Sequence, residues 1–144
     1  MSGQLYTTEI LRLAASIPHH ARLVHAHATA EKRSPVCGSR VTVDVALDAG
    51  GRVGEVGLLV RACALGQASS SLLAQNILGR TPDELATARD GLTAWLAGKG
   101  EPPDWPGLAV LAAARDYPAR HPSIRLAFEA AAAAAADAAR AKAA

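Results

Sequence analysis

The sequence predicts an α+β domain in which a small antiparallel sheet is covered by helices. Apolar and polar residues alternate over residues 41–47, and a glycine-rich turn follows them. Segments before and after this hairpin instead repeat apolar residues at helical spacing. The chain has 144 residues, and 50% of them are hydrophobic, which suits one domain with a buried core. We therefore expect a single domain over residues 1–144, with two or three strands and about five helices.

The first element is a helix. Its apolar residues recur three to five positions apart and can share one face: Leu5, Ile10, Leu13 and Ile17. The spacing predicts a helix over residues 5–17, which Pro18 helps to end. Residues 19–35 have no clear period but hold four histidines: His19, His20, His25 and His27. A histidine cluster can indicate a metal site, but nothing in the sequence makes these residues converge, so we favour a solvated, partly irregular segment.

The hairpin is the clearest element. Four apolar residues point one way, and polar or small residues alternate with them: Val41, Val43, Val45 and Leu47 against Thr42, Asp44, Ala46 and Asp48. This predicts a half-buried strand. Residues 48–51 form the turn because their glycines accept positive φ, and residues 52–62 return as a second strand. Gly54 and Gly57 indicate a bulge or a close approach of another backbone segment.

The second half of the chain is helical. Residues 69–80 predict a helix that Gly79 ends, with this apolar side: Leu72, Leu73, Ile77 and Leu78. Thr81, Pro82 and Glu84 form the signature of a capping box, and the helix that they begin turns four residues inward: Leu85, Leu92, Trp95 and Leu96. A loop over residues 97–107, a short helix over 107–115 and a long helix over 123–142 follow. The seven alanines at 130–136 favour a helix but offer little to bury, so we expect residues 130–144 to form a low-complexity helical tail that frays or projects.

Charge and hydropathy exclude several classes of protein. Fifteen basic and 13 acidic residues give a formal charge of +2, and the basic residues are scattered along the chain. Aromatic residues make up only 3% of the chain. We therefore do not expect nucleic-acid binding. No uncharged apolar run approaches the roughly 18 residues of a membrane span. The N-terminus lacks the pattern of a secretory signal. We expect a cytoplasmic protein, whose cysteines are more often thiols than disulfides.

The two cysteines flank the hairpin. Cys37 precedes the first strand and Cys63 follows the second, so antiparallel pairing should bring them to one end of the sheet, away from the turn. Cys63 also stands shortly before a helix N-terminus, where free amides stabilise a thiolate. The spacing leaves three interpretations open: small buried hydrophobes, a metal or redox pair, or a disulfide. Serine hydrolysis is disfavoured because the chain has no GxSxG motif.

Four segments resemble a known family: LYTTEILRLAASIPHHARL, SPVCGS, ACALGQASSSLL and YPARHPSIRLAFEA. Together they are similar to the U-type iron–sulfur cluster assembly scaffolds, the family of NifU N-terminal domains, IscU and SufU. The resemblance covers roughly residues 5–130. It implies a sheet-and-helix fold in which three cysteines, with a fourth ligand, hold a nascent [2Fe–2S] cluster or a zinc ion.

The match to the family's ligands is incomplete. Cys37 and Cys63 fall at the first two cysteine positions, but Ser39 replaces the aspartate of the turn and Ser123 stands where the third cysteine is expected. A serine hydroxyl is a much poorer ligand than a thiolate for iron–sulfur or zinc chemistry. His121 is a candidate substitute ligand, which we expect on the extended approach to the last helix because Pro122 follows it. Asp116 is a weaker candidate.

The resemblance implies a scaffold or carrier rather than a turnover enzyme. It would bind iron, a [2Fe–2S] cluster or zinc through Cys37 and Cys63, with His121 or an external thiol completing the site. Its partners would be a cysteine desulfurase, which supplies sulfur, and recipient apo-proteins, and it would be a monomer or a weak homodimer. Two alternatives stay open: a diverged member without a cluster that acts as an interaction module for a desulfurase or assembly partner, and a thiol that accepts a persulfide.

Overall fold

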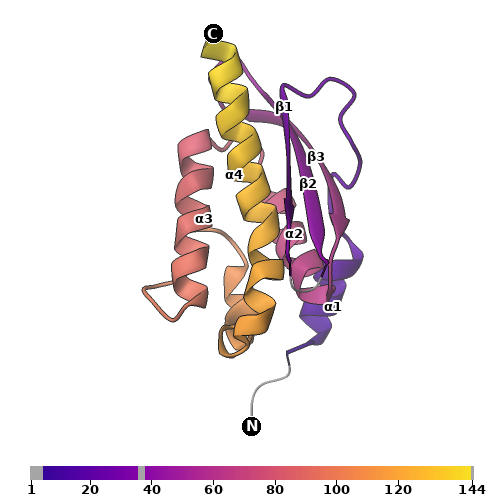
Figure 1. Cartoon of the computed structure of the whole chain (residues 1–144), viewed down its shortest axis with the longest axis vertical. Coiled ribbons are helices and arrows are strands. Elements are labelled where there is room, and N and C mark those ends of the chain that lie inside the picture. The colour runs from indigo at the N-terminus through magenta and orange to yellow at the C-terminus, as the bar shows by residue number, and fades with distance from the viewer. Residues whose placement is uncertain (1–4, 36–37, 144) are drawn as a thin grey trace.

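The computed structural model describes residues 5–35 and 38–143, and it confirms the α+β prediction (Figure 1). Helix α1 (Thr8–Ala15) precedes three strands, β1 (Ala28–Arg33), β2 (Arg40–Leu47) and β3 (Val53–Arg61). Helices α2 (Ala64–Asn76) and α3 (Pro82–Leu96), the 3-10 helices η1 (Leu108–Asp116) and η2 (Pro118–Arg120), and helix α4 (His121–Ala143) follow. Within the described residues, no helix is long and apolar enough to cross a membrane.

The sheet has the order β1-β2-β3 and is antiparallel throughout. The predicted hairpin is confirmed, since β2 pairs with β3 through a turn in which the Asp48 carboxylate accepts hydrogen bonds from two backbone N–H groups. Both interpretations of the strand glycines are confirmed as well. Gly54 is the extra residue of a bulge, because Ala46 pairs with Glu55 and the next residue pairs with Val53. At Gly57, a Cβ would lie only 2.3 Å from the backbone oxygen of Ala21.

The expectation of a half-buried strand is wrong, because β2 is buried on both faces. Residues 19–27 run along the outer face of the sheet and are mostly exposed, so the expectation of a solvated, partly irregular segment is confirmed, although the segment is anchored to the sheet. Its anchor is Asp44, which is fully buried and accepts two hydrogen bonds from the Arg22 guanidinium at 2.7 and 3.1 Å, one from Leu23 N at 3.0 Å and one from the Thr29 hydroxyl at 2.5 Å. A single buried carboxylate thus fixes a segment that has no hydrophobic period of its own.

Two of the four histidines also hold this segment in place. His27 Nδ1 accepts a hydrogen bond from Leu47 N at 3.0 Å, and His20 Nε2 accepts one from Val60 N at 3.3 Å. The end of the same segment forms β1, whose exposed charged residues are typical of an edge strand. The sequence does not clearly indicate β1, because the side chains of this strand are mostly polar.

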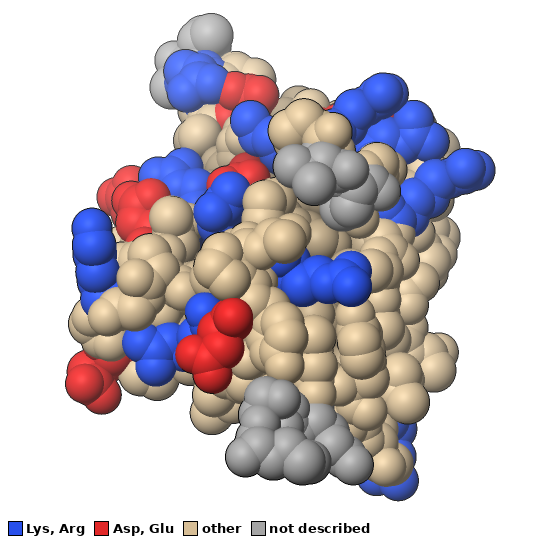
Figure 2. Space-filling model, turned by 60° about the horizontal axis from the view of Figure 1, so that its bottom comes forward, with Lys and Arg blue, Asp and Glu red and all other residues tan. Residues whose placement is uncertain are grey.

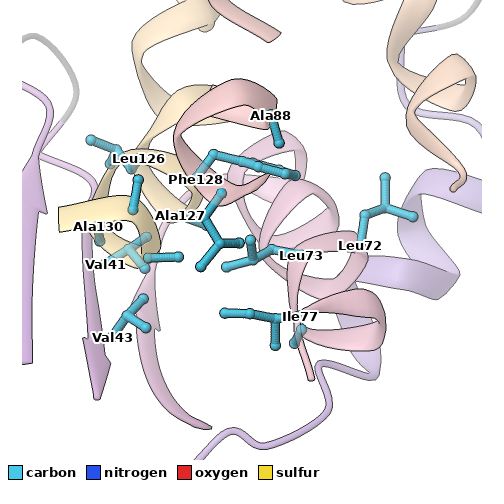
Figure 3. Packing of buried hydrophobic residues seen from close by; sticks show 14 of the residues in the cluster. Val41, Val43, Leu72, Leu73, Ile77, Ala88, Leu126, Ala127, Phe128 and Ala130 are labelled. Carbon is cyan, nitrogen blue, oxygen red and sulfur yellow. The ribbon is translucent and has the colours of Figure 1, made fainter. Parts of the chain in front are cut away.

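Helix α4 packs along the inner face of the sheet, with α3 on its other side (Figure 1). Figure 3 shows α4 residues Leu126, Ala127 and Ala130 beside Val41 and Val43 of β2. The expectation of a projecting tail is wrong for the alanine run, which includes these residues at most 2% exposed: Ala130, Ala131, Ala132, Ala134 and Ala135. Alanine side chains are short enough to let the helix fit closely between the sheet and α3, so they pack where larger residues would not.

The remaining helices match the predictions in part. The capping box of α3 is confirmed, and its four inward residues are buried. Helix α1 is shorter than predicted, and Leu78 is 48% exposed rather than inward. Helix α2 begins at Ala64 rather than residue 69, so the three serines lie within it and their hydroxyls donate to backbone carbonyls. Helix α4 begins at His121, two residues earlier than predicted.

Candidate functional site

Cys63 occupies the junction between β3 and α2. It is the N-cap residue of α2, with extended backbone, and its side chain makes no capping hydrogen bond to the helix amides. Its side chain is partly exposed and lines an open hollow with Gly38, Ser39, Arg61 and Gln67 among its neighbours. The prediction that Cys63 stands at a helix N-terminus is confirmed. The amides at the start of a helix carry partial positive charge, and α2 presents them beside Cys63.

Two serines from distant parts of the sequence converge on Cys63. Ser123 Oγ lies 3.2 Å from Cys63 Sγ, and Ser39 Oγ lies 3.2 Å from Ser123 Oγ. Both serines are buried, at 4% exposure for Ser39 and 2% for Ser123. One serine directly precedes β2, and the other lies in the first turn of α4. We call Cys63, Ser39 and Ser123 the thiol–hydroxyl cluster.

The first turns of α2 hold Ser123 in place. A Cβ at Gly66 would lie 2.5 Å from Ser123 Oγ and 3.1 Å from its backbone oxygen, so only glycine allows this approach. One turn further along α2, the Ser69 hydroxyl donates to the Ile124 carbonyl at 2.7 Å. Neither residue was singled out from the sequence. A glycine inside a helical pattern is the one signal of close packing that could have identified Gly66.

Cys37 lies outside the described residues. The residues that follow it, Gly38 and Ser39, border the hollow that Cys63 lines. Strand pairing places Arg40 directly opposite Arg61, so the start of β2 adjoins the end of β3 as predicted. The closeness of the two sulfurs stays a prediction.

The structure does not bring His121 into the hollow of Cys63. Its Nε2 lies 2.9 Å from the Ala114 carbonyl oxygen, and its side chain borders a different hollow together with Arg115 and Asp116. The expectation of an extended backbone is wrong, because His121 has helical φ and ψ of −60° and −43°. The turn of η2 continues into α4, because the His121 N–H donates a hydrogen bond to the Pro118 carbonyl. This hydrogen bond outweighs the preference for extended backbone that Pro122 imposes on the residue before it.

The donor set limits what this site can do. The cluster offers one thiol and two hydroxyls, and the described part of the chain has no group of three or more His, Cys, Asp or Glu residues that could hold a metal ion. The thiol is a soft donor that suits iron, zinc and sulfur chemistry, whereas the hydroxyls are weak, neutral donors. The cluster therefore contributes one strong ligand or nucleophile, the Cys63 thiol, and two polar hydroxyl groups near it.

Fold and site together define a class: an α+β domain with an antiparallel hairpin whose open end carries a cysteine at a helix N-terminus. The family model described as the NifU-like N terminal domain matches residues 5–123. The chain therefore belongs to the family of NifU-like N-terminal domains.

Solved structures give the same result. The chain is similar to a nitrogen-fixing NifU-like protein (N-terminal) from Brucella abortus, with 37% identity, a TM-score of 0.89 and coverage of 94% of this chain and 95% of that one. It has the fold of a putative iron–sulfur cluster assembly scaffold protein for the SUF system from Fervidobacterium islandicum, at 22% identity and a TM-score of 0.81, over 91% of this chain and 96% of that one. A hypothetical protein shares the fold at 20% identity and a TM-score of 0.73, over 89% and 94% of the two chains. Comparison with curated proteins gave no match.

Proposed function

We propose that this protein is an iron–sulfur cluster assembly scaffold or carrier, which holds iron or a nascent [2Fe–2S] cluster as cargo through the thiolates of Cys37 and Cys63. One observation carries the proposal. Three residues that the resemblance placed at ligand positions of the family meet at the open end of the hairpin: Ser39, Cys63 and Ser123. Ser123 Oγ lies 3.2 Å from Cys63 Sγ and 3.2 Å from Ser39 Oγ. Family membership and the related structures support the same assignment.

The ligand set for this cargo is incomplete within the cluster. Cys63 and Cys37 supply two thiolates, and the hydroxyls of Ser39 and Ser123 are poor replacements for a carboxylate and a third thiolate. An external thiol, from a small molecule or a partner, would complete the site through the open hollow at Cys63. We therefore expect labile binding, which suits a protein that passes its cargo on.

The protein's own groups prepare Cys63 for this role. Cys63 stands at the start of α2, where the helix amides carry partial positive charge, and the Ser123 hydroxyl lies within hydrogen-bonding distance of its sulfur. Zinc can occupy the same donors. The expected partners are a cysteine desulfurase and recipient apo-proteins in the cytoplasm, and the chain would act as a monomer or a weak homodimer.

Two specific observations favour other functions. Ser123 lies within hydrogen-bonding distance of both Ser39 and Cys63, which suits an interaction module that has lost its cluster. The partial exposure of Cys63 at a helix N-terminus suits a persulfide acceptor instead. In that reaction the Cys63 thiolate attacks the outer sulfur of a donor persulfide, the new S–S bond forms, and the donor cysteine leaves as a thiolate.

Anaerobic reconstitution with ferrous iron and sulfide separates these functions. A scaffold acquires bound iron and sulfide together with visible absorbance, and Cys63→Ser abolishes both. An interaction module acquires neither in the unmodified protein, which would contradict the proposal. A persulfide acceptor also acquires no iron, but mass spectrometry after exposure to a persulfide donor finds one added sulfur on Cys63.

The role of His121 needs its own comparison. If an external thiol completes the site, His121→Ala and the control His25→Ala retain equal zinc at neutral pH, because the His121 imidazole contacts the Ala114 carbonyl instead. Selective loss of zinc from His121→Ala would show that the imidazole rotates to the metal.

A further inference from the structure

The strand register places three arginines side by side at the open end of the sheet. Arg33 of β1 is the direct partner of Arg40 of β2, and Arg40 is the direct partner of Arg61 of β3. Side chains of directly paired residues stand on the same face. We call these residues the arginine row. The sequence hid it, because the three arginines are spread over 29 positions and their neighbours in the chain are not basic runs.

The charges of this row are not balanced within the fold. Glu31 pairs with Arg33 at 2.8 Å and lies 4.0 Å from Arg40, and among the described residues Arg61 has no ion pair. Like charges directly opposite one another in a sheet are destabilising. A row of three cations against one carboxylate therefore costs stability, which indicates a role other than holding the fold together.

The row lies on a part of the sheet that the described residues leave open. Residues 19–27 cover the outer face near Asp44 and Gly57, towards the middle and the turn. At the other end, Arg40 and Arg61 border one open hollow with Thr42 and Leu59, and all three arginines border a second hollow. Leu59 is 43% exposed, so this surface offers one apolar contact beside the charges. Figure 2 shows Lys and Arg side chains gathered towards the upper right of the face that it draws, with few acidic side chains among them.

The row is continuous with the thiol–hydroxyl cluster. Arg61 stands two residues before Cys63 and borders the hollow of Cys63 as well as both hollows of the row. A molecule bound along the row would therefore reach the cysteine. The positive charge of the row therefore influences which molecules approach Cys63.

We infer that the arginine row docks an acidic segment of a partner protein and so presents that partner to Cys63. This inference rests on the proposed function for the importance of Cys63. Planar guanidinium groups bind carboxylates with two hydrogen bonds each, and three of them in a line match acidic side chains spaced along an extended segment. A nucleic acid fits less well, because Glu31 interrupts the row and none of the described residues that line these hollows is aromatic, so a base has nothing to stack on.

Fluorescence anisotropy with a labelled hexaglutamate peptide tests the inference on the full chain without iron. Uncharged hexaglutamine is the peptide control, and Arg52→Gln, at the turn end of the same sheet, is the matched protein control. We expect Arg61→Gln and Arg40→Gln each to weaken binding about fivefold or more, Arg52→Gln to change it less than about twofold, and added salt to weaken it, as for exposed charge pairs. The melting temperature of Arg61→Gln should stay the same or rise, which a structural role would not produce.

Equal binding by Arg61→Gln, Arg40→Gln and Arg52→Gln would overturn the inference. So would tighter binding of a short single-stranded oligonucleotide than of hexaglutamate through the same arginines, which would assign the row to nucleic acid. Because the peptide is bound by the iron-free chain, a failure to load iron leaves this result intact. The inference and the proposed function therefore fail in separate experiments.

Discussion

Replacing Ser123 by cysteine should convert a labile metal site into a stronger one. Ser123 Oγ lies 3.2 Å from Cys63 Sγ, and two sulfurs that share a tetrahedral metal at about 2.3 Å lie about 3.8 Å apart. The carbon–sulfur bond is longer than the carbon–oxygen bond, so a sulfur at residue 123 extends further from the backbone than the serine hydroxyl does. The geometry therefore lets the new thiolate join Cys63 on one metal with little movement of the backbone.

The size of the effect follows from the value of one ligand. Complete four-ligand zinc sites contribute about 10–16 kcal/mol at pH 7, so one thiolate ligand is worth about 2.5–4 kcal/mol. Because each 1.4 kcal/mol is a factor of ten, the Ser123→Cys protein should bind zinc about 60-fold to 700-fold more tightly. It should also depend less on added thiol.

The assay is a zinc titration of the reduced apo-protein against a chromophoric chelator. Ser71→Cys is the control, because it adds a thiol at a buried serine of α2 whose hydroxyl contacts Ser16 rather than Cys63. A gain in Ser123→Cys alone supports a shared site. A gain of less than about threefold, or an equal gain in Ser71→Cys, would refute the reasoning, because neither can come from one added ligand at Cys63.

Two further predictions concern the supports of the site. Hydrogen bonds from Arg22, Thr29 and Leu23 outweigh burial and hold the pKa of Asp44 below its ordinary value, so the stability that Asp44 contributes is full above about pH 4 and is lost as the pH falls below that. Asp44→Asn should therefore lower the free energy of unfolding by about 2 kcal/mol at pH 7. Denaturant titrations should find a smaller difference in unfolding free energy between the variant and the unmodified protein near pH 2. The same difference at both pH values would contradict this account. Gly66→Ala should displace Ser123, because the added Cβ would lie 2.5 Å from the Ser123 hydroxyl. This variant should bind zinc more weakly than the control Gly50→Ala at the hairpin turn. Equal zinc affinities of the two variants would show that α4 shifts without affecting the site.

The hairpin and the capped helix could be predicted because their signals are local. Alternating valines, a glycine turn and a capping box each specify structure within a few residues. The covering of the outer sheet face could not be predicted, because it depends on one buried carboxylate that meets Arg22 across 22 positions. The alanine run was misjudged for a similar reason, since its burial depends on how closely the sheet and α3 approach α4.

The site was predictable in its positions and less so in its geometry. The resemblance placed Ser123 at the third ligand position, and the structure brings this residue to Cys63. His121 was misplaced because its backbone follows η2 into the helix. The arginine row was missed because only the strand register brings Arg33, Arg40 and Arg61 together.

The most direct test of the central claim is X-ray absorption at the zinc edge of the unmodified protein loaded with one equivalent of zinc. The account predicts two sulfur neighbours at about 2.3 Å, from Cys37 and Cys63, with oxygen or nitrogen neighbours at about 2.0–2.1 Å completing the shell. Cys63→Ser should leave one sulfur neighbour. A zinc ion with no sulfur neighbour in the unmodified protein would contradict the assignment of this end of the sheet as a metal- and cluster-binding site.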